Sequence, residues 1–225
     1  MKQKPSAQDY RDRALALQRA GDSVQAIELY KKSLELEPDE PFALYNMGLA
    51  YANIGDKDSA LEAYQRSVIL FPRSEAYLNM GYLFELKGLY LKAIENYERA
   101  IALNPNEACS HHNLAGCYMR MKQYEMSTNS YREAIRIKPD YQSARLGFAQ
   151  TFFLRRKFHT AIRLYHILVE EYPDSDRAIY HMAHVYDLQG NFAAALIKFR
   201  RLLELQPGAA YVLKAIKDIE DVMRN

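Results

Sequence analysis

A proline recurs through almost the whole chain at intervals of 33 or 34 residues. These prolines are Pro38, Pro72, Pro105, Pro139, Pro173 and Pro207. A fixed period of this length indicates one structural unit used repeatedly, stacked on its own neighbours, instead of an irregular globular domain. The chain has 225 residues, of which 49% are hydrophobic, so six such units can each bury apolar surface.

The residues before each proline keep the same character from one unit to the next. An aromatic residue stands eight positions before it and a small residue twelve positions before it, as Tyr64 and Ala60 do before Pro72. Apolar and small residues lie three or four positions apart, which indicates amphipathic helices rather than strands. The proline ends the second helix because it cannot continue the hydrogen-bond ladder, and Gly55 marks a left-handed turn between the helices. The sequence therefore predicts two helices per unit.

These offsets resemble the tetratricopeptide repeat family, whose 34-residue unit carries Leu-Gly, Tyr, Ala, Phe and Pro at the same places. The resemblance implies an all-α, right-handed superhelical solenoid of six helix pairs. A C-terminal capping helix is expected after them, because the last repeat would otherwise expose an apolar face. The expected bounds are 1–6 for an N-terminal tail, 7–40, 41–73, 74–107, 108–141, 142–175 and 176–209 for the repeats, and 210–225 for the cap.

An asparagine stands at the sixth position of three consecutive repeats, as Asn46, Asn79 and Asn113. In the family this position lines the concave surface. The side-chain amide both donates and accepts hydrogen bonds, which suits it to a peptide group. Helices of neighbouring repeats lie roughly 10 Å apart and an extended strand advances about 3.3 Å per residue, so each Asn would meet every third residue of a bound peptide. The alternative, that these Asn side chains bond to one another or to a neighbouring helix, stays open.

Apolar and aromatic side chains are expected around this Asn ladder, which favours a partner protein with hydrophobic side chains. The expected groove residues are Phe42, Tyr45, Leu49, Tyr82, His112, Met119 and Arg120. Some family members hold a C-terminal carboxylate with a clamp of Lys, Asn and Arg. Arg11 and Asn46 match two places of that clamp, but Leu15 stands where an Asn is required. We therefore expect an extended peptide in the groove and no carboxylate clamp.

A basic segment, residues 132–166, suggests an alternative function. It holds eight Lys or Arg against two acidic residues, although the whole chain has a net charge of only +2. Such a segment is typical of proteins that bind an acidic partner. Arg155, Arg156 and Lys157 are the candidate contacts to a polyanion or nucleic acid. These three residues fall in a turn between helices, so they do not line a groove with the other basic residues. A peptide therefore remains the expected partner and nucleic acid the alternative.

The motifs of common catalytic sites do not occur in the sequence. It has no glycine-rich phosphate loop, no nucleophile elbow and no HExxH. His181, His184 and Asp187 follow one another at i, i+3 and i+6, but the first and last diverge around a helix, so we expect no metal site. There is also no run of 18 apolar residues and no leader pattern. We expect a cytoplasmic, monomeric, non-catalytic scaffold without a cofactor or membrane insertion.

Overall fold

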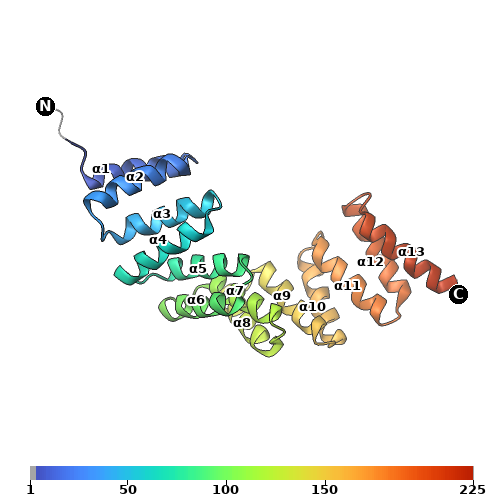
Figure 1. The fold of residues 1–225 in the computed structure, drawn as a ribbon. Coiled ribbons are helices and arrows are strands. Elements are labelled where there is room, and N and C mark those ends of the chain that lie inside the picture. The colour runs from blue at the N-terminus through green and yellow to red at the C-terminus, as the bar shows by residue number, and fades with distance from the viewer. Residues whose placement is uncertain (1–3, 225) are drawn as a thin grey trace. The chain divides into compact units, whose positions relative to one another are not determined.

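The computed structural model describes residues 4–224, which contain thirteen helices and no strand (Figure 1). The all-α solenoid of helix pairs is thus confirmed. Residues 1–3 of the expected tail and residue 225 of the expected cap lie outside the described residues. The helices are α1 (Ala7–Arg19), α2 (Ser23–Leu36), α3 (Pro41–Asn53), α4 (Lys57–Leu70), α5 (Ser74–Leu86), α6 (Tyr90–Leu103), α7 (Ala108–Arg120), α8 (Tyr124–Ile137), α9 (Gln142–Leu154), α10 (Phe158–Glu171), α11 (Asp176–Leu188), α12 (Phe192–Leu205) and α13 (Ala210–Arg224).

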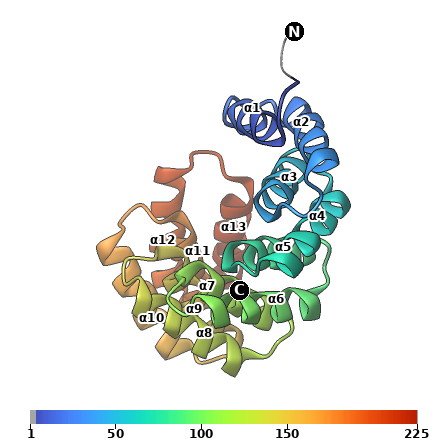
Figure 2. The same ribbon diagram turned by 90° about the vertical axis from the view of Figure 1, so that its left-hand side faces the viewer.

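The chain forms two compact units, an N-terminal unit up to Cys117 and a C-terminal unit from Tyr118 on. In the N-terminal unit, the pairs α1/α2, α3/α4 and α5/α6 stack in chain order (Figure 1). The odd-numbered helices form one layer and the even-numbered helices the other (Figure 2). We call the side of α1, α3 and α5 that faces away from α2, α4 and α6 the odd-helix face. The C-terminal unit contains α8 to α13.

The two layers of the N-terminal unit are held together by tyrosines from the even-numbered helices. Tyr64 of α4 and Tyr97 of α6 are fully buried. A Cβ atom added to Gly48 would lie 2.7 Å from the Tyr64 ring, and one added to Gly81 would lie 2.6 Å from the Tyr97 ring. No carbon atom fits at that distance, so glycine at these places lets the tyrosine reach under the odd-numbered helix.

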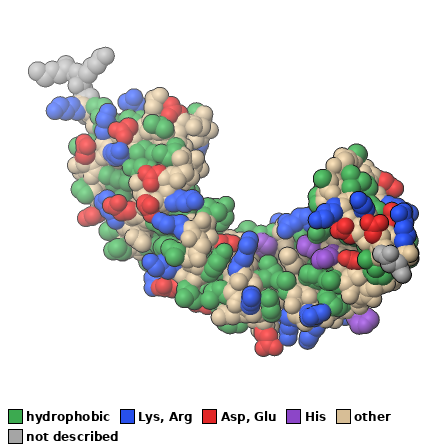
Figure 3. Space-filling model, turned by 45° about the vertical axis from the view of Figure 1, so that its right-hand side comes forward, with side chains coloured by type: hydrophobic (Ala, Val, Ile, Leu, Met, Phe, Trp, Pro, Cys, Tyr) green, Lys and Arg blue, Asp and Glu red, His purple; other side chains and the backbone are tan. Residues whose placement is uncertain are grey.

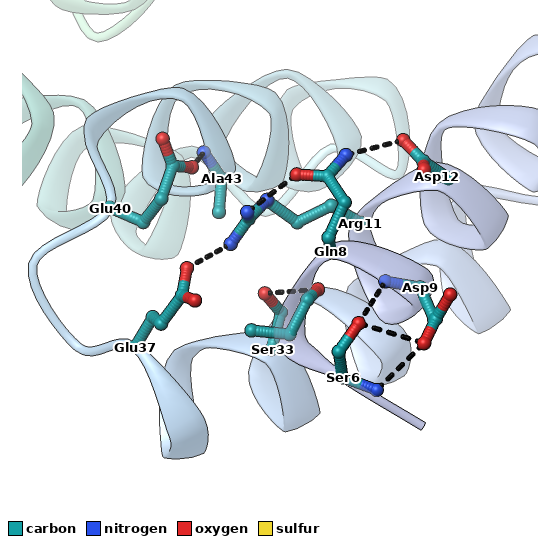
Figure 4. Close-up of polar contacts among 10 residues, drawn as sticks. Ser6, Gln8, Asp9, Arg11, Asp12, Ser33, Glu37, Glu40 and Ala43 are labelled. Carbon is teal, nitrogen blue, oxygen red and sulfur yellow. Dashed lines mark hydrogen bonds and ion pairs between the residues drawn. The ribbon is translucent and has the colours of Figure 1, made fainter. Parts of the chain in front are cut away.

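Serines of the even-numbered helices bind the first residues of the odd-numbered helices. The Ser33 hydroxyl donates to the main-chain oxygen of Ala7 at 3.0 Å, and Ser67 donates to that of Pro41 at 2.8 Å. At the start of α1, Ser6 and Asp9 also form a reciprocal capping box (Figure 4). The capping box satisfies main-chain N–H groups that a helix start leaves without a partner, whereas the serine bonds tie neighbouring helices together.

The C-terminal unit has two neighbouring cores. Tyr165 of α10 is buried in one and Phe199 of α12 in the other. Helix α13 packs on the second core through Val212 and Ile219, which are buried, while Tyr211 on the same helix is half exposed. The apolar face expected for residues 210–225 is therefore turned inwards at Val212 and Ile219.

The turn between the two helices of a repeat needs a residue with positive φ. Gly55 supplies it in the second repeat, as the sequence predicts, and Gly21 and Gly88 supply it in the first and third repeats. In the fourth and fifth repeats, Lys122 (φ 60°) and Arg156 (φ 58°) adopt the same conformation. Side chains with a Cβ atom are strained in this left-handed region. The sequence gives no sign of this strain, because a lysine or an arginine is not typical of a residue with positive φ.

Replacing either strained residue by glycine is expected to stabilise the chain. Lys122→Gly and Arg156→Gly should each raise the free energy of unfolding by about 0.5–1 kcal/mol, since glycine adopts positive φ without a steric cost. Urea unfolding followed by circular dichroism measures the change. The reciprocal control is Gly55→Lys, which should lose a similar amount. A loss of stability in both glycine variants would contradict the assignment of strain.

Candidate functional site

A pocket of about 430 Å³ opens on the odd-helix face of the N-terminal unit, between α3 and α5. Three of the predicted groove residues line it together: Leu49 of α3, and Asn79 and Tyr82 of α5. Its size lies within the range of ligand pockets, roughly 300–1,000 Å³. The other lining residues are Ala52, Asn53, Gly55, Lys57, Tyr64, Leu83 and Leu86. We call it the Tyr64 pocket.

The Tyr64 side chain, from α4, is fully buried behind this pocket. Its hydroxyl group finds no hydrogen-bond acceptor among the residues that the structure describes. Burial raises the pKa of Tyr64, so the hydroxyl keeps its proton over the whole physiological range. A buried polar group without a partner is rare and destabilising. The Tyr64 hydroxyl therefore lacks a hydrogen-bond acceptor that a bound ligand can supply.

The equivalent tyrosines of the neighbouring repeats do have partners. Tyr30 donates to Oε1 of Gln18 at 3.0 Å, and Tyr97 donates to Oε2 of Glu85 at 3.0 Å. In both cases the acceptor stands twelve residues before the tyrosine. The residue twelve before Tyr64 is Ala52, which has no polar side chain. The residue types at these positions are visible in the sequence. A tyrosine eight positions before the proline nevertheless indicates only a core residue until the partner of its hydroxyl group is known.

Asn79 is held by the protein itself. Its Nδ2 donates to the Tyr45 hydroxyl at 3.5 Å, and the Arg73 guanidinium lies 4.5 Å from the centre of the Tyr45 ring. The Asn79 side chain also lies near the Tyr64 hydroxyl, where it opposes the rise in pKa that burial causes. Asn79 therefore has a partner within the chain. Its geometry matches the alternative, a bond to the neighbouring helix.

Asn46 lines a different and smaller pocket, of about 250 Å³, between α1 and α3. Its main-chain oxygen accepts from Nε2 of Gln18 at 3.4 Å. Arg11, on the wall of the same pocket, forms an ion pair with Glu37 at 2.5 Å and donates to Gln8 (Figure 4). The arginine that matches the carboxylate clamp is thus already paired with a carboxylate of the chain.

The remaining predicted groove residues lie away from the Tyr64 pocket. Phe42 of α3 is half exposed and lies under the Arg73 guanidinium, 5.1 Å from it. His112 and Asn113 are half-buried in α7 of the N-terminal unit. Met119 and Arg120 belong to the C-terminal unit, where the Met119 sulfur accepts from the Thr151 hydroxyl at 3.9 Å.

The basic segment is partly neutralised within the C-terminal unit. Arg155 forms an ion pair with Glu125 at 3.3 Å, and the Arg156 guanidinium lies 6.0 Å from the centre of the Phe158 ring. Lys157 is exposed at the start of α10. On the displayed face of the N-terminal unit, basic and acidic side chains are interspersed (Figure 3). These contacts do not favour polyanion binding, which stays a prediction.

The histidines of α11 take part in an aromatic cluster. The His181 ring stacks on Tyr165 with 5.7 Å between ring centres, and Nδ1 of His184 lies 3.9 Å from Oδ2 of Asp187. Burial lowers the pKa of His181 to about 4, and Arg177 adds to the effect. Within residues 4–224, no three His, Cys, Asp or Glu side chains come together in a way that could hold a metal ion. None of the described helices has the length and apolarity needed to span a membrane.

Comparison with known proteins gives consistent matches. Family models of the tetratricopeptide repeat match residues 11–75 and 146–210, residues 74–107 and residues 110–141. The photosystem I assembly protein Ycf3 of Rippkaea orientalis is 36% identical in an alignment of 115 residues, and the match covers 43% of this chain and 66% of that protein. The chain thus spans slightly less than two thirds of that relative's length.

Two solved structures are similar in fold. The crystal structure of MamA has a TM-score of 0.70 and 27% identity, and the match covers 73% of this chain and 90% of MamA. YrrB, described as a TPR protein with an unusual peptide-binding site, has a TM-score of 0.71 and 18% identity over 84% of this chain and 97% of its own. At that identity, the likeness to YrrB concerns the fold alone.

Proposed function

The chain belongs to the tetratricopeptide repeat family, and we propose that it is a non-catalytic scaffold that binds an extended peptide of a partner protein. The peptide lies on the odd-helix face of the N-terminal unit. The observation that carries this proposal is the Tyr64 pocket, where three predicted groove residues meet. The Ycf3 relative is named an assembly protein, which supports the coarse role of holding other proteins. The chain acts as a cytoplasmic monomer, as the sequence predicts.

The composition of the pocket supports a peptide as occupant. Tyr82 and Leu86 are 52% and 49% exposed, so large apolar surface faces solvent beside the buried Tyr64 hydroxyl. Apolar walls with a few polar groups that fix orientation are typical of ligand sites. The walls take up apolar parts of side chains. The amides of Asn53 and Asn79 also line the pocket, and each donates a long bond of 3.5 Å within the chain, to Ser23 and to Tyr45.

The Asn ladder contributes contacts to the peptide main chain. Asn46 and Asn79 lie in consecutive repeats and line two separate pockets of the same face, so a strand crossing both pockets passes both amides. The bond from Asn79 to Tyr45 is long, at 3.5 Å, and is therefore weak enough to be exchanged for a bond to a peptide. Asn113 is the third member, at the same place in the next repeat.

Alanine substitutions of the ladder test this function. Asn46→Ala, Asn79→Ala and Asn113→Ala should each weaken binding by about 1 kcal/mol, roughly fivefold, because one hydrogen bond is lost. The probes are heptapeptides selected from a displayed random library against the wild-type chain, titrated by calorimetry. Asn106→Ala, in an exposed loop, is the matched control. A lowered melting temperature with unchanged affinity in all three variants would show that these asparagines are structural only.

A further inference from the structure

We propose that the Tyr64 pocket binds an acidic side chain of the partner peptide, with the Tyr64 hydroxyl as hydrogen-bond donor. This proposal rests on the proposed function and names the chemistry of the partner. It starts from the absence of any described hydrogen-bond acceptor for the buried Tyr64 hydroxyl, which lines an open pocket. An occupant that brings an acceptor oxygen to this hydroxyl removes the penalty of the unpaired group.

The neighbouring repeats show what such an acceptor looks like. The tyrosines at the same place bind a side-chain oxygen of Gln18 or of Glu85, each at 3.0 Å. Ala52 supplies no oxygen, and its small side chain leaves space at the position that Gln18 and Glu85 fill in their repeats. The pocket can thus receive from outside the carboxylate or carboxamide group that the other repeats carry themselves.

Charge selects the carboxylate over the carboxamide. Among the described residues that line the pocket, Lys57 carries a positive charge and none carries a negative charge. The nearest acids in the sequence are engaged elsewhere: Asp58 pairs with Lys87, and Asp56 accepts from the main chain and hydroxyl of Ser59.

The apolar wall favours glutamate among the acids. Leu49, Leu83 and Leu86 line the pocket and can contact the methylene groups of a side chain that reaches inwards. A buried carboxylate is stable only with several donors. The Tyr64 hydroxyl, the Asn79 amide and the Lys57 ammonium group together provide them.

The C-terminal unit has the same unpaired hydroxyl but has closed the space around it. The Tyr165 hydroxyl is buried and forms no hydrogen bond with a described residue. The residue twelve before it is Phe153, whose ring is much larger than the methyl group of Ala52. His181 also stacks on the Tyr165 ring. A missing partner therefore makes a binding site only where a small residue leaves room, as at Ala52.

The test uses the full chain and heptapeptides selected from a displayed random library. Each selected peptide is titrated by calorimetry in its original form and with its acidic residue replaced by the neutral amide. We expect the replacement to weaken binding at least about tenfold, as for a hydrogen bond to a charged group. Ala52→Gln restores the internal acceptor of the first repeat, so it should raise the melting temperature and abolish the preference for acidic peptides.

Two tyrosine variants show whether the hydroxyl is unpaired in the free chain. Tyr64→Phe should leave the melting temperature unchanged or raise it, and it should weaken the binding of acidic peptides about tenfold. Tyr97→Phe, the matched control, should lower the melting temperature because its hydroxyl bonds to Glu85. An equal loss of melting temperature in both variants would overturn the proposal, since Tyr64 would then have a partner in the chain.

The outcomes separate this proposal from the function on which it rests. If selected peptides bind Ala52→Gln as tightly as the wild-type chain, the acidic pocket is wrong and the peptide scaffold stands. If the library yields no peptide that binds the wild-type chain, the scaffold function and the pocket both fail.

Discussion

Lowering the pH from 7 to 4 is expected to destabilise the C-terminal unit by about 3 kcal/mol through His181 alone. Burial lowers the pKa of this imidazole from 6.5 to about 4 in the folded chain, and Arg177 and His184 act in the same direction. Below pH 6.5 the unfolded chain takes up a proton that the folded chain accepts only near pH 4. The stability contributed by neutral His181 is therefore complete above about pH 6.5 and is lost as the pH falls through that window.

Urea unfolding at several pH values measures this effect. Carboxylates titrate in the same range, so the informative quantity is the difference between the wild-type chain and His181→Gln. That difference should change by about 3 kcal/mol between pH 7 and pH 4. His159→Gln, at an exposed position of α10, is the matched control and should follow the wild-type curve. Parallel curves for the wild-type chain and His181→Gln would show that the imidazole titrates normally.

Gly48→Val is expected to lower the free energy of unfolding by about 3 kcal/mol, because the added carbon atoms overlap the Tyr64 ring. A Cβ atom alone would lie 2.7 Å from that ring, and Tyr64 is fully buried. Gly48→Ala should cost less, about 1 kcal/mol, since alanine favours the helix while causing the smaller overlap. A shifted Tyr64 ring would also move its hydroxyl in the pocket, so both variants should bind the selected peptides more weakly.

The control for this prediction separates overlap from helix propensity. Ala16→Val places valine at an exposed position of α1 and should change stability by less than about 1 kcal/mol. Combining Gly48→Ala with Tyr64→Leu should show a favourable coupling, because the smaller side chain removes the overlap. Additive losses in that double variant would mean that Tyr64 is not the group that opposes a side chain at Gly48.

Much of the fold could be predicted because its rules are local and repeated. A helix pair needs apolar residues at intervals of three and four, a residue for the turn and a proline at the end. These features recur at the same positions in six repeats, so each one predicts the helix pair more strongly than a single copy would. The positive φ of Lys122 and Arg156 was not predicted, because the preferences of these two residue types oppose it.

The candidate site was predictable only in part. Placing Leu49, Asn79 and Tyr82 on one face follows from helix periodicity, and they do line one pocket. The state of Asn79 does not follow, because its bond to Tyr45 links two repeats, and residues that are distant in sequence meet only after the helices stack. Lys57 was likewise missed, since the end of a turn carries no sign that it borders a pocket.

The sequence by itself thus determined the number, kind and order of the helices and which face of each one is polar. The tertiary structure alone decided which buried tyrosine lacks a partner. Tyr30, Tyr64 and Tyr97 occupy the same place in their repeats and are all buried. They differ because a hydrogen bond acts over about 3 Å and depends on what the facing helix presents there. Gln18 and Glu85 present an oxygen, while Ala52 presents a methyl group and leaves a pocket.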